Sequence, residues 1–458
     1  MSRRWTALSQ GSMPRRDIRD DSAVTMPNAD PIVGTAPSCQ ESRVSVISRL
    51  QLRNCRHWQR AFASQHKDRR YYEIVEDTIH PEFDYWYFAI RDRLGDIQAI
   101  QPFFILDLDI LAGARPQFGR LIDAIRLRWP RFMFMKAIMV GCAAGEAHLD
   151  EGDDSTHAAT AQCLAGAIVQ HAHALGARLI VLKEFPDRYR DVLSCFVRGG
   201  FTRIPSMPLT RLNIAYASFD DYMQSALNSA TRRKLRKKFK ATEFDAPIAL
   251  SVTHDIEPII DEVYPLYVQV YERSKLHFEK LTKEYFCRLG TAMPDKVRFF
   301  VWRRDGKVVA FGVCLVHGDT VFAEYLGLDY SVALELHLYH YVFRDLVRWA
   351  IANGYRWFQS TGLNYDPKLH LRHWLKPVDL YVRHTSAIIN ILMRIALPLL
   401  EPTRHDVTLK KFPNYVDLWG SDSAAGMSSN GAARSNSMTK TDVRKGWGHL
   451  TRREHHDA

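Results

Sequence analysis

Long hydrophobic runs are missing from this sequence. No apolar stretch reaches the roughly 18 residues that a membrane-spanning helix needs, so we expect no such helix. The N-terminal region has arginines but no apolar segment, and Asp17, Asp20 and Asp21 interrupt it, which is unlike a secretory signal. The seven cysteines are scattered without CxxC spacing, which argues against a disulfide framework and a zinc ribbon. We therefore expect a cytoplasmic protein.

The length limits the number of domains, and the net charge limits the class of partner. A chain of 458 residues is long for one domain and comfortable for two domains with tails. Its hydrophobic share of 46% and charged share of 25% are typical of soluble proteins. A net charge of +11 favours partners that carry phosphate, such as CoA, tRNA, nucleotide-linked sugars or an anionic lipid surface. The charge alone does not choose among them.

Composition and periodicity divide the chain into two α/β blocks between tails. Residues 1–43 and 420–458 mix small and polar residues without periodicity, and we expect both tails to be disordered. We expect the first domain over 44–215, the second over 216–386, and a C-terminal helix and extension over 387–419.

Strands and helices alternate in both blocks. The turn Asp305-Gly306 predicts a hairpin between the strands 297–303 and 307–316. The first block should hold a mainly parallel sheet, because its strands alternate with helices. The other expected elements are a helix over 55–66, strands over 132–140, 178–182, 202–214, 320–326, 356–360 and 378–383, and helices over 156–175, 188–197 and 334–352.

Two local patterns in the second block match a known family. One is the basic helix Thr231–Lys240, and the other is Gly354-Tyr355 before a strand, followed by Gly-x-x-Tyr-x-x-Lys at Gly362, Tyr365 and Lys368. On these residues the second block resembles the BioF2-like acetyltransferase domain. The order of elements is similar to the GNAT acyltransferase fold, and its repetition resembles the FemAB-like arrangement of two GNAT units.

The resemblance implies two tandem GNAT-like N-acyltransferase domains with mixed sheets. It implies an amine-bearing small molecule or peptide as acceptor. The donor would be acyl-CoA, as in GNAT enzymes, or an aminoacyl-tRNA or nucleotide-linked donor, as the FemAB-like arrangement suggests. Two features depart from the family pattern: Gln359 and Ser360 stand where an Asp is frequent, and neither block has the glycine-rich pyrophosphate signature.

Glu324 is the leading catalytic candidate. It lies mid-strand on the same face as Phe322 and Leu326, where a carboxylate is costly unless it has a partner. Burial would raise its pKa toward that of a useful base, and the GNAT resemblance implies a general base on this strand. The alternative is a structural carboxylate paired with an arginine.

The turn after this strand is the cofactor-binding candidate. Backbone N–H groups of Leu326, Gly327, Leu328, Asp329, Tyr330 and Ser331 precede a helix, as in many anion sites. Asp329 would compete with a phosphate there, so the carboxylate would instead bind an amine or merely order the turn. The sequence leaves both readings open.

Other candidates lie elsewhere in both blocks. Lys368 would neutralise a phosphate or carboxylate, and Tyr365 would protonate a leaving group or position substrate, unless the two are a surface lysine beside a packed tyrosine. Lys183 and Glu184 follow a strand, at the end where α/β sheets bind ligands, or form an exposed ion pair.

The helix 231–240 has seven Lys or Arg in ten positions and no interleaved Glu. Such density repels itself and is better explained by a polyanion than by a solvated face, so Arg232, Arg233 and Arg236 are candidate contacts for RNA, nucleotide phosphates or lipid.

Two histidine pairs and one apolar stretch are best explained as structural features without a function of their own. The pairs His337/His340 and His370/His373 have zinc-compatible spacing but no converging ligands, so we expect no metal. The apolar stretch 387–400 is too short to span a bilayer. It should pack on the second block, and the alternative is peripheral contact with the inner face of an anionic membrane.

The sequence thus predicts an acyltransferase with Glu324 as base. The rival hypothesis is a non-catalytic module that binds RNA or anionic lipid through its basic helix.

Overall fold

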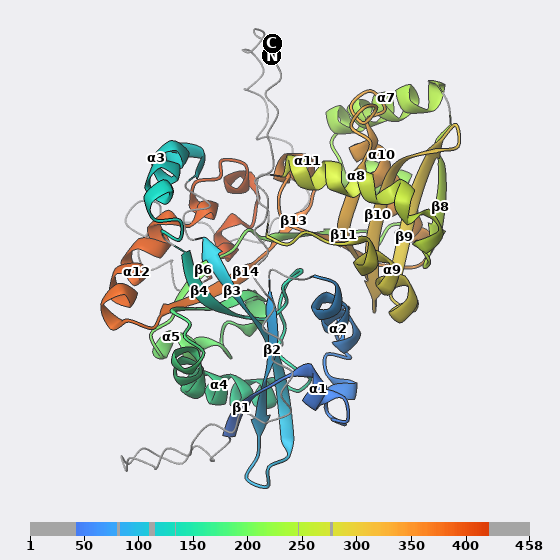
Figure 1. The fold of residues 1–458 in the computed structure, drawn as a ribbon. Coiled ribbons are helices and arrows are strands. Elements are labelled where there is room, and N and C mark those ends of the chain that lie inside the picture. The colour runs from blue at the N-terminus through green and yellow to red at the C-terminus, as the bar shows by residue number, and fades with distance from the viewer. Residues whose placement is uncertain are drawn as a thin grey trace, which may run out of the picture. The chain divides into compact units, whose positions relative to one another are not determined.

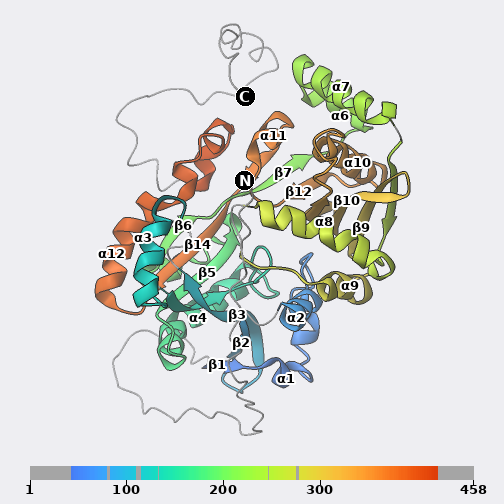
Figure 2. The ribbon, with the colours of Figure 1, turned by 45° about the horizontal axis from the view of Figure 1, so that its top comes forward.

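A computed structural model describes residues 43–79, 83–109, 115–132, 134–245, 247–274 and 278–420. The tails predicted over 1–43 and 420–458 lie almost entirely outside these ranges. The described part holds two mixed sheets of seven strands each, which are covered by helices (Figures 1 and 2). The expected architecture of two tandem α/β units with mixed sheets is confirmed. None of the described helices has the length and apolar character to cross a membrane.

The first sheet has the strand order β1-β2-β3-β4-β5-β14-β6. Only β4 and β5 pair in parallel there, so the prediction of a mainly parallel sheet was wrong. The strands are β1 Arg43–Ile47, β2 Asp84–Arg91, β3 Ile97–Asp109, β4 Phe134–Val140, β5 Leu179–Pro186, β14 Val378–His384 and β6 Thr202–Pro205.

The second sheet has the order β13-β7-β12-β11-β10-β9-β8, and its one parallel pair is β11 with β12. The predicted hairpin is present as β9 and β10; Asp305 and Gly306 both have positive φ, as its two-residue turn requires. The strands are β13 Trp374–Lys376, β7 Leu209–Asn213, β12 Trp357–Ser360, β11 Thr320–Leu328, β10 Lys307–His317, β9 Val297–Arg304 and β8 Ala249–Thr253.

The two sheets exchange strands. The single strand expected over 202–214 is two strands, β6 in the first sheet and β7 in the second. In return β14, at the end of the second block, lies between β5 and β6 of the first sheet. Each sheet is therefore completed by a segment from the other half of the chain. The predicted domain boundary at 215–216 stays a prediction.

Helices cover the outer faces of both sheets. Side-chain caps begin several of them: Asp68 caps α2, Asp153 caps α4 and Thr282 caps α9. The helix expected over 55–66 is a short 3-10 turn among other turns, and the helix lies later, at α2. The helix expected over 188–197 begins only at Ser194. The helices are α1 Arg49–Leu52, α2 Arg69–Thr78, α3 Arg115–Arg128, α4 Asp154–Ala174, α5 Ser194–Arg198, α6 Phe219–Ala226, α7 Ser229–Asp245, α8 Ile260–Arg273, α9 Lys283–Ala292, α10 Leu338–Ala352, α11 Tyr365–His370 and α12 Ala387–Leu400.

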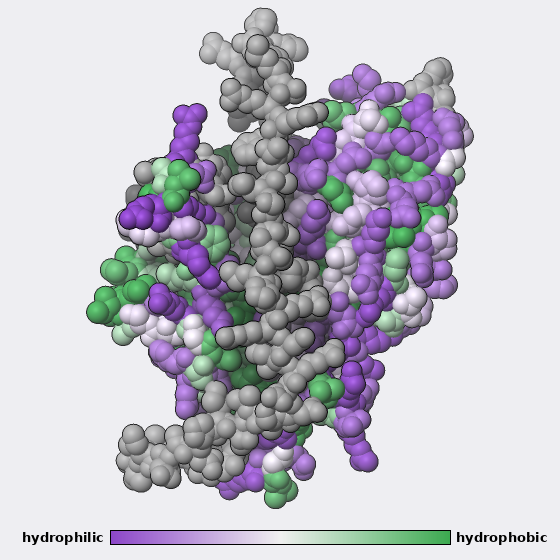
Figure 3. Space-filling view, viewed as in Figure 1, coloured by the Kyte–Doolittle hydropathy of each residue, from purple (hydrophilic) through white to green (hydrophobic). Residues whose placement is uncertain are grey.

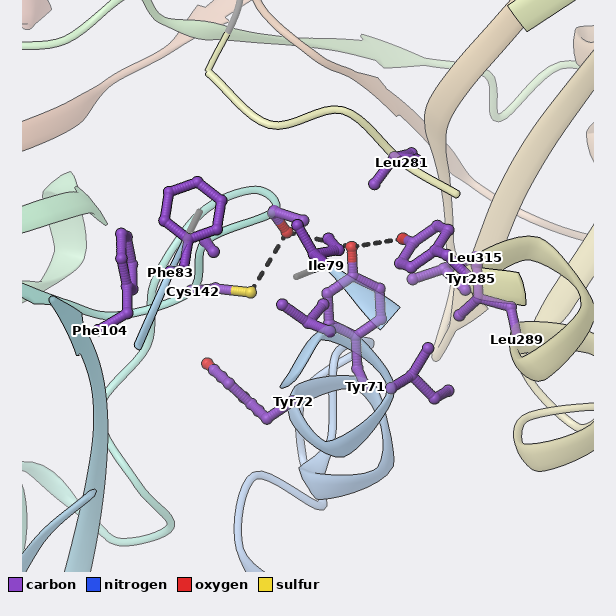
Figure 4. Packing of buried hydrophobic residues seen from close by; sticks show 14 of the residues in the cluster. Tyr71, Tyr72, Ile79, Phe83, Phe104, Cys142, Leu281, Tyr285, Leu289 and Leu315 are labelled. Carbon is purple, nitrogen blue, oxygen red and sulfur yellow. Dashed lines mark hydrogen bonds between the residues drawn. The ribbon is translucent and has the colours of Figure 1, made fainter. Parts of the chain in front are cut away.

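One apolar cluster joins side chains of both halves of the chain. Tyr71 and Phe104 come from the first half, and Tyr285 and Leu315 come from the second (Figure 4). At its centre the hydroxyls of Tyr71 and Tyr285 are 2.8 Å apart, and the Tyr71 hydroxyl donates to the carbonyl of Ala144. This shared core fixes the loops that carry the polar groups described next. Separate clusters fill the outer faces, under α4 in the first sheet and under α10 in the second.

Candidate functional site at the junction of the two sheets

The two parallel strand pairs end at the same buried region. Pairing of β4 with β5 ends at Val140 and Leu182, and pairing of β11 with β12 ends at Ala323 and Ser360. Where neighbouring parallel strands part, side chains and loops can enter between them, and α/β sheets commonly bind ligands at such ends. We call this region the junction and define it as residues 65–68, 141–146, 182–184, 278–279, 323–325 and 359–361.

Both strand ends carry a β-bulge. On β11, Ala323 and Tyr325 pair with adjacent residues of β10, so Glu324 is the extra residue of the bulge. On β5, Lys183 and Glu184 lie at the irregularity opposite β14, and Glu184 has φ of +57°. Bulges re-aim side chains, and strained backbone concentrates at functional sites. The local geometry therefore turns three charged side chains toward the junction.

Lys67 is the centre of the junction. Its ammonium lies 3.0 Å from Oε2 of Glu146 and 2.9 Å from Oε2 of Glu324, and its side chain is fully buried. Gly145 makes room for it, because a Cβ there would lie 2.1 Å from Nζ. The sequence left open that Glu324 is a structural carboxylate paired with an arginine. The structure pairs Glu324 with a cation, and that cation is a lysine.

Lys67 and Glu146 hold each other in the charged form. Burial opposes both charges, but the carboxylates of Glu146 and Glu324 raise the pKa of Lys67 well above its usual value. Burial likewise opposes the ionised form of Glu146, yet the ammonium of Lys67 and the ring of His66 hold its pKa well below the usual range. An ammonium between two carboxylates leaves the group with one excess negative charge, which suits a cationic or amine ligand.

Two buried histidines adjoin this group. His66 Nε2 lies 3.5 Å from Oε1 of Glu146 and 3.4 Å from Oε1 of Glu324, and its ring stacks on Phe322 at 3.8 Å. Phe322 and Glu324 therefore do share a face. His148, with its pKa lowered well below the usual value by burial, completes a set with His66 and Glu146 whose ligand atoms lie within 4.8 Å of one another. These three could hold a metal ion; Lys67 already supplies a positive charge there.

Lys183, Glu184 and Glu279 form a second charged group beside the first. The ammonium of Lys183 donates to Oε2 of Glu184 at 2.7 Å and to the carbonyl of Gly145 at 3.0 Å. Burial raises the pKa of Glu279 to about 7, although the charge of Lys183 opposes that rise. The Tyr325 hydroxyl donates to Glu279 at 3.3 Å. Lys183 and Glu184 lie at the end of β5, as expected, and their binding of a ligand stays a prediction.

Tyr365 and Lys368 lie on α11, behind Glu184. The loop between β6 and β7 connects the two sites. Its Ser206 hydroxyl donates to Glu184 at 3.1 Å, and its Pro208 carbonyl accepts from the Tyr365 hydroxyl at 2.9 Å. Lys368 donates to the carbonyl of Thr361 at 2.5 Å, and burial lowers its pKa to about 7. In the described residues no hydrogen bond or ion pair joins Tyr365 or Lys368 to Glu324.

The turn after β11 is internally satisfied. The N–H groups of Asp329, Tyr330 and Ser331 donate to Val309 O, Gln269 Oε1 and Asp329 Oδ1. Leu326, Gly327 and Leu328 belong to β11 and pair with β10. Protein acceptors thus take the N–H groups of 329–331 in this structure, and the binding of an anion by this turn stays a prediction. Asp329 orders the turn, and it pairs with Lys307 at 2.9 Å.

The basic helix is present as α7, away from the junction. Arg232 donates to the carbonyls of Gln224 and Leu227, so it ties α7 to α6. Arg233 and Arg236 are exposed and, within the described residues, have no ion-pair partner. The apolar stripe of α7 is buried, as expected, at Leu235 and Phe239. The exposed cations remain free to meet an anionic partner.

Comparison with known proteins gives one family match, over about half of the chain. Among curated proteins, none matches this sequence. Residues 149–376 match a family named FemAB-like and described as peptidoglycan biosynthesis/recognition. The chain contains a FemAB-like domain. This domain includes Lys183, Glu184, Glu279, Glu324 and Lys368, whereas His66, Lys67 and Glu146 precede it.

Several solved structures match this chain at low sequence identity and low TM-score. FemX is 11% identical, with 68% of this chain and 90% of that chain covered and a TM-score of 0.43. L-PGS from Bacillus licheniformis is 11% identical, with 71% and 95% covered and a TM-score of 0.42. A tandem GNAT protein from the clavulanic acid biosynthesis pathway is 10% identical, with 68% and 86% covered and a TM-score of 0.36.

Sequence reasoning missed four junction residues: His66, Lys67, Glu146 and Glu279. Lys67 precedes the cap of α2, and Glu146 follows a loop of small residues, so neither has a periodic signal. Glu279 stands between Phe278 and Lys280 in a loop. Their partners lie far away along the chain, and only the tertiary fold brings them together. The glycines around 141–145 were the one available sign, because glycine permits close approach of another side chain.

Proposed function

We propose that this protein transfers an acyl or aminoacyl group to an amine and that the reaction takes place at the junction. The observation that carries the proposal is the meeting of both parallel strand ends at one buried set of acids and lysines within a FemAB-like chain. The bulge at Glu324 supports the same placement. We also propose the domain division at 215–216, with the junction between the two domains.

The reaction needs a base that is ionised near neutral pH. The amine nitrogen attacks the donor carbonyl carbon, a C–N bond forms, and the C–S bond of a thioester or the C–O bond of an aminoacyl ester breaks. The amine proton passes to the base, and the leaving thiolate or hydroxyl oxygen takes up a proton. Glu279 fits the base role best, because a pKa of about 7 matches the operating pH.

The other junction residues have supporting roles in this proposal. Glu324 is the alternative base; held against Lys67, it also offers the negative charge that attracts an ammonium substrate. Lys183 faces Glu279 and Glu184 and would hold the acyl oxygen or a substrate carboxylate. Lys368 would bind an anion, because contact with a negative charge would restore its proton. Tyr365 would position the loop at Pro208 rather than donate a proton, since burial raises its pKa.

The donor and acceptor follow from charge and family. The exposed cations of α7 favour a polyanionic donor such as an aminoacyl-tRNA, and acyl-CoA is the second candidate. The family description, peptidoglycan biosynthesis/recognition, favours an amine on a peptide as the acceptor. Both donors are made in the cytoplasm, where we place the reaction.

Amide formation from radiolabelled donors tests the proposal. The purified chain is incubated with labelled acyl-CoA or aminoacyl-tRNA and a panel of peptide amines. We expect labelled amide with the native chain and at least a hundredfold lower rate with Glu279→Gln. Glu284→Gln, on an exposed helix face, is the matched control and should keep the native rate. Salt-sensitive RNA binding without any amide product would instead support the non-catalytic module.

A further inference from the structure

Helix α12 presents its apolar side to solvent. Its inward residues include Asn390, whose side chain accepts from the backbone N–H of His384 at 3.0 Å and donates to the carbonyl of Gly200 at 2.9 Å. Met393 and Leu397, one and two turns later, pack on the core. The helix therefore lies on β14, which belongs to the expected second block, and also on β6, which belongs to the first.

The outward face is almost entirely aliphatic. A helix that faces water normally places polar residues outward, so this arrangement is the reverse of ordinary amphipathicity. Figure 3 shows the hydrophobic patch at the left of the molecule, where Figure 1 places α12. The exposed residues, with their exposed fractions, are Ile388 75%, Ile389 40%, Ile391 59%, Leu392 61%, Ile395 64%, Leu399 65% and Leu400 74%.

Helix α3 extends this surface. Figures 1 and 2 both show α3 beside α12. At its C-terminal end Leu127 is 88% exposed and Trp129 is 63% exposed. Exposed contiguous apolar surface of this kind marks an interaction site, and tryptophan is enriched where proteins meet the headgroup region of a membrane. We call α12 together with residues 127–132 the apolar platform.

The charged residues of the apolar platform itself are arginines, and Asp107 on the neighbouring strand β3 pairs with one of them, Arg131, at 2.6 Å. Arg394 is exposed on α12, and Arg128 is exposed beside Trp129. The sequence of 387–400 and that of 124–134 contain no aspartate or glutamate. A cationic rim around an aliphatic face matches a bilayer with anionic headgroups, because the alkyl side chains enter the acyl region while arginines meet phosphate.

Other occupants fit this platform less well. A symmetric second copy would place Arg394 and Arg128 against the same cations, and the neighbouring carboxylates of Asp107 and Asp109 already pair with Arg131 and Arg126. The chain beyond the described residues, 1–42 and 421–458, is rich in small and polar residues and offers few aliphatic side chains to cover it. With 14 residues at about 1.5 Å each, α12 is too short to cross a hydrocarbon core of about 30 Å. A helix of this length would lie in the interface.

We propose that the apolar platform binds the surface of an anionic membrane, with α12 parallel to the bilayer plane. The interaction is peripheral, and it stands independently of the proposed acyl transfer. Side chains of α12 and of the C-terminal end of α3 would hold the chain at the membrane. The cations of α7, on the second sheet, would stay available for another partner.

Vesicle co-sedimentation of the full chain tests this proposal. We expect binding to vesicles of phosphatidylglycerol and phosphatidylcholine, and about tenfold or more weaker binding by Ile391→Asp/Ile395→Asp, because both isoleucines lose their place in the interface. Leu94→Asp, which changes an 89% exposed leucine in the β2–β3 turn, is the matched control and should bind like the native chain.

The same experiment separates the other readings. Arg394→Glu should weaken binding to the anionic vesicles and leave binding to pure phosphatidylcholine unchanged. Equal binding by the native chain and the double variant would overturn the proposal. A native dimer in light scattering that Ile391→Asp/Ile395→Asp converts to monomers, without vesicle binding, would overturn it in favour of a second copy.

Discussion

Replacing Lys368 by methionine should change how stability depends on pH. Lys368 is 7% exposed, and its ammonium donates to the carbonyl of Thr361 at 2.5 Å. Burial without an opposing carboxylate lowers its pKa from 10.5 to about 7. Methionine has a similar length, carries no charge and keeps the packing against the ring of Tyr365, so the substitution mainly removes the ionisation.

The direction of the effect follows from proton binding. Between about pH 7 and 10.5 the unfolded chain holds a proton on Lys368 that the folded chain has released, so folding gains stability as pH rises. The depressed pKa therefore gives the native chain a stability that is present at high pH and is lost as pH falls through about 7. One pH unit corresponds to about 1.4 kcal/mol, so three units give a change of about 4 kcal/mol.

Urea denaturation at pH 7, 8, 9 and 10 measures this. The free energy of unfolding of the native chain minus that of Lys368→Met should rise by about 4 kcal/mol from pH 7 to pH 10. Lys234→Met, at an exposed position on α7, controls for the loss of a lysine. A difference between native and Lys368→Met that stays constant over these four pH values would refute the reasoning.

Two further perturbations test other parts of the structure. Lys67→Met should lower the free energy of unfolding by about 3–5 kcal/mol in urea, because it removes the ammonium from two buried carboxylates. Lys307→Met, which removes an exposed ammonium from Asp329, should cost no more than about 1 kcal/mol. Similar losses for both would contradict the junction's charge pairing. Arg233→Glu/Arg236→Glu should weaken tRNA binding and reduce its dependence on salt. Salt dependence equal to that of the native chain would show that α7 does not contact phosphate.

The sequence was sufficient for features with local causes. The hairpin of β9 and β10 was predictable because Asp305-Gly306 supplies the two positive φ angles of its turn. The strand that carries Glu324 was predictable, as was the face that Glu324 shares with Phe322. The bulge at Glu324 breaks the alternation, so Leu326 packs with Ala323 on the other face and that part of the prediction was wrong. The inner stripe of α7 followed from the spacing of Leu235 and Phe239.

Long-range placement was beyond the sequence. The exchange of β7 and β14 between the sheets depends on tertiary pairing, which leaves no periodic mark on either strand. Lys67 meets Glu146 and Glu324 only after the loops before α2 and after β4 reach the end of β11. Asp329 could be an amine ligand or a turn residue by sequence, and the position of Ser331 and Lys307 around it decides for the turn.

The pH dependence of amide formation tests the central claim most directly, that an acid of the junction takes the proton of the acceptor amine. The groups that face Glu279 are Lys183, Glu184 and the Tyr325 hydroxyl, and its pKa of about 7 means that the base is ionised above neutrality. For the native chain and Glu284→Gln, kcat/KM should rise with pH and level off above about 7. Glu279→Gln should lose that rise. Native rates and a native pH profile in both Glu279→Gln and Glu324→Gln would contradict acyl transfer at the junction.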